Sequence, residues 1–179
     1  MKLKVSTPLL VFVVYFTTTT LFRWQWSLSL VWFWLGGALG MLFIYLDRLI
    51  YIYWTRPHEQ LSEHLRHLLE SKRFREALTL IDQRQAEQRQ LVSKSVLFMA
   101  AWAAASLFII TSAASLLATG FVLGIGLRLF LDIVKDIRHL LRLKDWLFWP
   151  IKRAVTLEET KIVVVVFFAV FLFFTLLVI

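Results

Sequence analysis

The longest run of residues without a charge limits what this chain can fold into. In the stretch SKSVLFMAAWAAASLFIITSAASLLATGFVLGIGLRLF, the 33 residues 95–127 between Lys94 and Arg128 are all uncharged. A single helix of this run would be about 50 Å long at 1.5 Å per residue. The hydrocarbon core of a bilayer is only about 30 Å thick, and membrane helices tilt by about 20° on average. We therefore predict two helices with a turn near 111–115 (TSAAS) rather than one.

Three further uncharged blocks have the length of one membrane crossing, about 20 residues. With the long run divided in two, the predicted spans are residues 5–22, 27–46, 95–111, 114–131 and 162–179. The composition agrees, because 59% of the residues are hydrophobic and the mean hydropathy is +0.71, whereas soluble domains are nearer half apolar. The first block lacks an A-x-A-like cleavage site in TTTTLFRWQW, so we interpret it as a retained span and not a signal peptide.

The distribution of basic residues predicts the orientation of these spans. With the N-terminus inside, segments 1–4, 48–94 and 128–161 face the cytoplasm and hold 2, 9 and 8 of the 20 Lys and Arg residues. This is the bias that cytoplasmic loops show. The sequence thus predicts an all-α polytopic membrane protein with five spans, N-in and C-out, in a plasma or inner membrane. We attribute the net charge of +8 to contact with anionic headgroups rather than with nucleic acid.

Small residues on three spans predict close helix packing. Glycine and alanine let helix backbones approach, so that van der Waals contact can replace the hydrophobic drive that lipid removes. Either helices of one chain or helices of several copies could meet in this way. The predicted packing residues form small-xxx-small patterns: Gly36, Gly40, Ala100, Ala101, Ala104, Ala105, Gly120 and Gly124, with Gly126 beside them.

Two cytoplasmic segments have helical patterns of their own. Residues 57–91 predict a helical hairpin, and LLESKRFREALTLID within it resembles the inter-helix turn of a tetratricopeptide repeat over about half a repeat. Residues 132–149 predict that the fourth span continues as an amphipathic helix in the membrane surface, with Trp146 and Trp149 at the headgroups. TLEE at 156–159 fits an N-cap and capping box before the last span.

Reactive groups are sparse. The chain has no cysteine, and no nucleotide loop, catalytic triad or carboxylate pair is apparent within a span. His64 and His67 could place two ligands on one helix face, but zinc sites need three or four ligands. We therefore predict no catalytic, cofactor or metal site, and a structural ion pair between Asp47 and Arg128.

These patterns favour a structural or assembly role, as a homo-oligomer or as an accessory subunit of a larger membrane complex. The expected partners are anionic lipids, further copies of the chain or other membrane subunits. A channel or transporter pore formed between subunits is the alternative, with the hydroxyls of residues 17–20 and of Ser27 and Ser29 as the polar runs that could line it. A membrane enzyme that uses the His64–His67 patch is a third reading.

Overall fold

The computed structural model describes residues 6–23, 28–50, 67, 71, 92–112, 115–153 and 155–179. This part of the chain is helical and contains no strand. Its elements are α1 (Ser6–Arg23), α2 (Ser29–Ile50), the short 3-10 helix η2 (Val92–Lys94), α5 (Val96–Thr111), α6 (Leu116–Asp136), α7 (Leu140–Leu147) and α8 (Leu157–Val178). The predicted hairpin at 57–91, with its resemblance to a tetratricopeptide repeat, lies outside the described residues except for His67 and Ser71.

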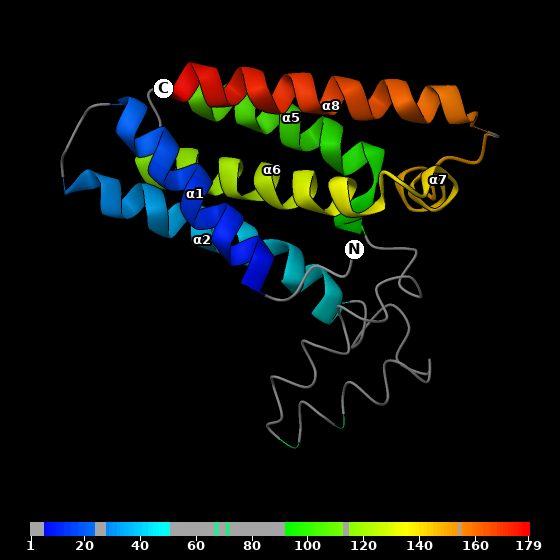
Figure 1. Cartoon of the computed structure of the whole chain (residues 1–179), viewed down its shortest axis with the longest axis horizontal. Coiled ribbons are helices and arrows are strands. Elements are labelled where there is room, and N and C mark those ends of the chain that lie inside the picture. The colour runs from blue at the N-terminus through cyan, green and yellow to red at the C-terminus, as the bar shows by residue number, and fades with distance from the viewer. Residues whose placement is uncertain are drawn as a thin grey trace.

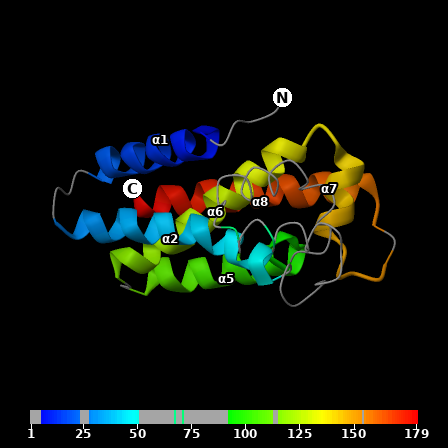
Figure 2. The same cartoon turned by 90° about the horizontal axis from the view of Figure 1, so that it is seen from below.

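The long helices run side by side and alternate in direction. Helices α1, α5 and α8 run one way, and α2 and α6 run the other way (Figures 1 and 2). The short helix α7 lies across one end of the bundle. At this end, called the α7 end below, α2 and α6 finish while α5 and α8 begin. Chain segments that are far apart in the sequence therefore meet there.

The long uncharged stretch forms two helices, which confirms the division that its length predicts. Helix α5 finishes at Thr111, and Ser115 caps α6 by accepting a hydrogen bond from the Ala118 N–H at 3.3 Å. Two helices, α6 and α8, are long and apolar enough to cross a membrane, with 21 and 22 residues. Residues 7–23 of α1, 29–44 of α2 and 96–111 of α5 form shorter apolar helices.

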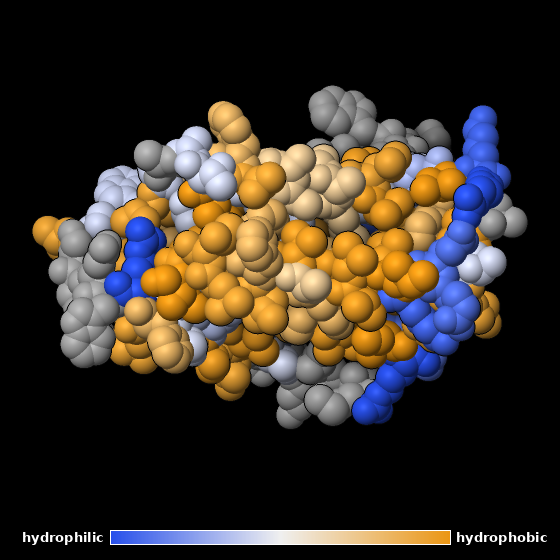
Figure 3. Space-filling view, turned by 90° about the horizontal axis from the view of Figure 1, so that it is seen from above, coloured by the Kyte–Doolittle hydropathy of each residue, from blue (hydrophilic) through white to orange (hydrophobic). Residues whose placement is uncertain are grey.

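Helix α6 is the central element and α8 lies at the surface. In their most apolar windows, 72% of the α6 residues are buried but only 28% of the α8 residues. Helix α6 contacts α1, α2, α5, α7 and α8. Figure 3 shows the resulting surface, which is apolar between hydrophilic residues at the α7 end and a smaller hydrophilic group at the opposite end.

The start of α8 carries the capping box that TLEE predicts. The Thr156 hydroxyl accepts a hydrogen bond from the Glu159 N–H at 3.2 Å, and the Glu159 carboxylate accepts one from the Thr156 N–H at 2.9 Å. Two backbone donors that the helix leaves unpaired are thereby satisfied. The prediction is confirmed, and α8 has a defined first residue.

The segment 132–149 differs from the single continuous helix that its pattern predicts. Helix α6 stops at Asp136, residues 137–139 form a turn, and α7 begins at Leu140. The His139 N–H donates to the Asp136 carbonyl oxygen at 2.8 Å within this turn. The bend folds α7 back over the bundle end, so that the buried side chains Leu143, Trp146 and Leu147 enter the core. Tertiary burial on α7 is therefore the physical reason for the break.

Candidate functional site

Glycines on α2 and α6 bring these two helices into backbone contact. A Cβ atom built on Gly36 or Gly40 would lie 2.0 or 2.1 Å from a carbonyl oxygen of the α6 backbone. A Cβ atom on Gly120 or Gly124 would lie 2.0 or 2.2 Å from a carbonyl oxygen of the α2 backbone. No side chain fits at such distances, so this interface requires glycine on both helices. The structure brings these four predicted packing residues together within one chain.

Gly126 has a different role from the other predicted glycines. A Cβ atom there would lie 2.4 Å from the Trp102 ring of α5 and 2.8 Å from the Phe171 ring of α8. The Trp102 indole N–H donates to the carbonyl oxygen of Val122 at 2.8 Å, which joins α5 to α6. Gly126 therefore makes room for the aromatic rings between α5, α6 and α8.

The predicted alanines of α5 lie at the surface of the described structure. Ala100, Ala101, Ala104 and Ala105 are all exposed. Ala100 also lies at an apolar groove of about 220 Å³ between α5 and α8. The groove is lined by Val96, Met99, Ala100, Trp102, Ala103, Ile162, Val163, Val166, Phe167 and Val170. These alanines are thus open to contact from outside the described structure.

Charged side chains are buried together at the α7 end. Asp132 of α6 is 0% exposed, and its carboxylate lies 3.5 Å from the Lys94 ammonium of η2 and 3.6 Å from the Arg128 guanidinium one turn earlier. Lys94 is 2% exposed and Arg128 is 0% exposed. Charges this deep are tolerated when opposite charges accompany them, and removing one partner is strongly destabilising. The group therefore joins the beginning of α5 to the end of α6.

A second buried contact links α6 to α7. The Asp136 carboxylate accepts a hydrogen bond from the Trp146 indole N–H at 3.1 Å and lies 3.9 Å from the Arg142 guanidinium. The Lys94 ammonium lies 5.4 Å from the centre of the Trp146 ring, within the range of a cation–π interaction. Trp146 is only 4% exposed. Trp146 is therefore held inside the chain by an acceptor on α6, and its position at headgroup depth remains a prediction.

Asp47 connects the end of α2 to η2. Its carboxylate accepts hydrogen bonds from the Ser93 N–H at 2.8 Å and the Ser93 hydroxyl at 2.7 Å. The structure thus joins Asp47 to Ser93 and Arg128 to Asp132. The predicted ion pair between Asp47 and Arg128 remains a prediction.

Sequence reasoning missed Lys94, Asp132 and Asp136 as members of one buried cluster. Asp132 and Asp136 lie off the apolar stripe of their segment, which suggests solvent exposure. A usable signal was present, because Arg128 and Asp132 are four residues apart on a helix that begins in an uncharged span, and such pairs face each other. The third member, Lys94, comes from a distant segment and has no local signal.

The charges of the buried cluster are held by neighbouring charges and by an indole N–H. Among the described residues, no group of three His, Cys, Asp or Glu side chains could hold a metal ion. Of the two histidines in the predicted patch, His67 alone is described, and it is exposed.

No protein-family model matches the chain, and no curated protein or solved structure is significantly similar to it.

Proposed function

We propose that the chain is an integral membrane protein with five spans, N-in and C-out, whose role is structural or assembly-related. The observation that carries this proposal is the apolar face of α8. Large apolar side chains are exposed along most of this helix: Ile162 near its start is 62% exposed, and Leu176 near its end is 63% exposed. Water would disfavour such a surface by roughly 25 cal/mol per Å², whereas lipid would cover it. The alternating helix directions support five successive crossings.

An assembly role is favoured over a pore because three of the four threonines at 17–20, which could line a pore, already use their hydroxyl protons within their own helix. The hydroxyls of Thr18, Thr19 and Thr20 donate to carbonyl oxygens of their own helix at 2.7–3.1 Å. Such hydroxyls have no proton left to donate to a permeating anion or to a column of water. The α5 surface offers small residues for helix contact instead, as a homo-oligomer or as an accessory subunit of a larger complex.

Cysteine labelling tests the five-span topology. Since the chain has no native cysteine, Arg23→Cys, Arg66→Cys and Lys152→Cys each introduce a unique thiol. In sealed membranes, a membrane-impermeant maleimide should label Arg66→Cys and Lys152→Cys from one side and Arg23→Cys from the other. Labelling of positions 66 and 152 from opposite sides would overturn this topology.

Substitution of the α5 surface tests the assembly role. Ala101→Leu with Ala105→Leu fills the small-residue face, and we expect at least a tenfold loss of association, about 1.4 kcal/mol. The readout is the particle mass in mild detergent, together with any membrane protein that co-purifies. Ala38→Leu on the exposed face of α2 is the matched control and should change neither. A wild-type chain that is monomeric and co-purifies with nothing would contradict the assembly role.

A further inference from the structure

The turn between α6 and α7 exposes apolar side chains. Val134, Ile137 and Leu141 are 41%, 39% and 65% exposed, although each is a large hydrophobic residue. Their neighbours Ile133 and Leu143 are 0% exposed and fill the core. We call the segment 134–142 the α6–α7 corner. Its outer side therefore carries an apolar strip that the described residues do not cover.

Basic side chains lie directly beside this strip. Residues 138–142 line an open cleft of about 510 Å³, to which Arg138, His139 and Arg142 contribute. Arg138 and His139 are exposed, and the Arg142 side chain is 40% exposed. The cleft thus combines two guanidinium groups, an imidazole and the exposed Leu141 side chain.

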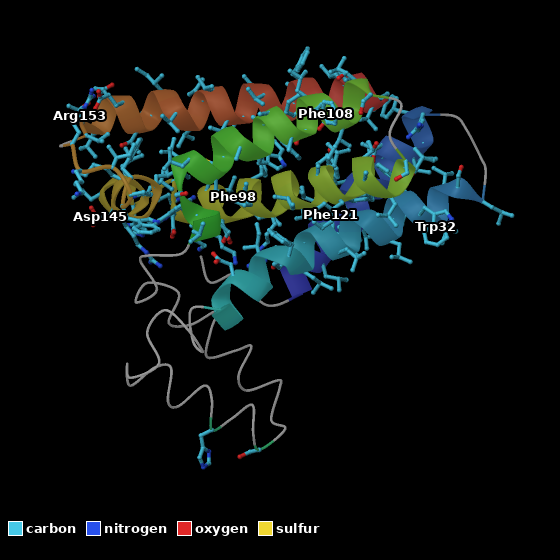
Figure 4. The ribbon with its side chains drawn as sticks, turned by 180° about the vertical axis from the view of Figure 1, so that it is seen from behind. Trp32, Phe98, Phe108, Phe121, Asp145 and Arg153 are labelled. Carbon is cyan, nitrogen blue, oxygen red and sulfur yellow. The ribbon has the colours of Figure 1, made fainter. Side chains whose placement is uncertain are left out.

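Acidic groups near the cleft cancel only part of this charge. Residues 135–145 include four Lys or Arg residues and two Asp residues. The Asp136 carboxylate, with a side chain 10% exposed, accepts a hydrogen bond from the buried Trp146 indole N–H and offsets part of the Arg142 charge at 3.9 Å. Asp145 is exposed on α7, and Figure 4 shows it at the same end of the bundle as Arg153. A cationic surface remains.

The position of the corner along α6 matches the depth of lipid headgroups. Helix α6 has 21 residues, and at 1.5 Å per residue it is about 31 Å long. A hydrocarbon core of about 30 Å then places residues 137–142 where phosphates lie. This step rests on the proposed membrane-spanning arrangement.

We propose that the α6–α7 corner binds an anionic phospholipid of the surrounding bilayer. Arg138 and Arg142 bind the phosphate, since guanidinium groups match its oxygens in geometry and charge. Val134, Ile137 and Leu141 contact the first part of the acyl chains. A free phosphate would leave this apolar strip uncovered. A zwitterionic lipid would place the positive group of its own headgroup close to the two arginines, which would repel it. Phosphatidylglycerol fits the corner and phosphatidylcholine does not.

Native mass spectrometry of the full chain in a neutral detergent tests the site. Phosphatidylglycerol and phosphatidylcholine are added in parallel, and phosphatidylglycerol should bind more tightly. At about one kcal/mol per basic residue near a lipid surface, Arg138→Gln with Arg142→Gln should weaken phosphatidylglycerol binding about 30-fold. Lys152→Gln with Lys161→Gln removes the same charge near the start of α8 and should weaken it by no more than about twofold.

Two further variants keep the result interpretable. Arg138→Gln alone leaves the Arg142–Asp136 contact in place and should weaken binding about fivefold. Leu141→Ser preserves all charges and should also weaken binding if acyl chains contact the strip. Equal binding by wild type and the double arginine variant would overturn the site. So would displacement of the lipid by millimolar inorganic phosphate, which would identify a free anion as the ligand.

The failure of this site and the failure of the membrane proposal are distinguishable. The same preparation is reconstituted into phosphatidylcholine vesicles and washed with alkaline carbonate. A chain that remains in the vesicles but shows no preference for phosphatidylglycerol overturns the lipid site alone. A chain that the wash extracts overturns the membrane-spanning arrangement as well.

Discussion

Replacing Asp132 with asparagine is expected to destabilise the protein by about 4 kcal/mol, which is the range for breaking a buried ion pair. The substitution preserves the shape of the side chain but removes the carboxylate that lies 3.5 Å from Lys94 and 3.6 Å from Arg128. Both cations are at most 2% exposed, so water cannot readily replace the lost charge. The measurement is the free energy of unfolding in mixed micelles titrated with a denaturing detergent.

Asp145→Asn is the matched control for this result. It makes the same chemical change on α7, but Asp145 is exposed, so its stability should stay within about 0.5 kcal/mol of wild type. Lys94→Met in the Asp132→Asn background should recover part of the loss, because one buried cation no longer needs a partner. If Asp132→Asn and Asp145→Asn have equal effects, the buried cluster does not stabilise the fold.

Replacing Gly120 with alanine is expected to destabilise the protein by about 2 kcal/mol. The new methyl group would lie 2.0 Å from the Phe33 carbonyl oxygen, and a backbone atom cannot rotate away as a side chain can. Overpacking of this kind costs about 1–3 kcal/mol, and the rigid partner places the expected loss at the upper end. The better helix propensity of alanine offsets about 1 kcal/mol. Unfolding in the same mixed micelles measures the difference.

The position of the added methyl group, not its presence, should decide this outcome. Ala38→Val adds two methyl groups to α2 at an exposed position and should have little effect. Gly124→Ala meets the α2 backbone at 2.2 Å and should resemble Gly120→Ala. A Gly120→Ala variant as stable as wild type would show that α2 and α6 separate readily, which contradicts a tight glycine contact.

Local patterns in the sequence predicted local features of the fold well. The excess length of residues 95–127 predicted the division into α5 and α6, and TLEE predicted the cap of α8. The cap depends on residues within one helical turn, and the division depends on comparing the length of one helix with the thickness of a bilayer. The small-residue spacing likewise singled out Gly36 and Gly120, which the structure places at the α2–α6 contact.

Features that depend on a distant partner were not predictable from the same patterns. Trp146 has the amphipathic side chain of a headgroup anchor, but it is buried within the chain because Asp136 of α6 accepts its indole N–H. Asp132 lies off its apolar stripe, but Lys94 from a remote segment makes burial possible. Hydropathy assigns each side chain a transfer energy without its partner. Hydropathy therefore does not predict the burial of charged and indole groups whose polar atoms are paired by tertiary contacts.

The glycine contact between α2 and α6 also constrains how the protein can be made. Gly120 follows Gly36 by 84 positions, so the ribosome delivers the second half of the interface about 4–17 s after the first, at about 5–20 residues per second. During this interval the glycine-containing face of α2 has no α6 helix to pack against. Biogenesis must therefore protect this early helix until α6 has been made, and a slow or interrupted ribosome between the two positions would prolong its exposure to quality-control proteases.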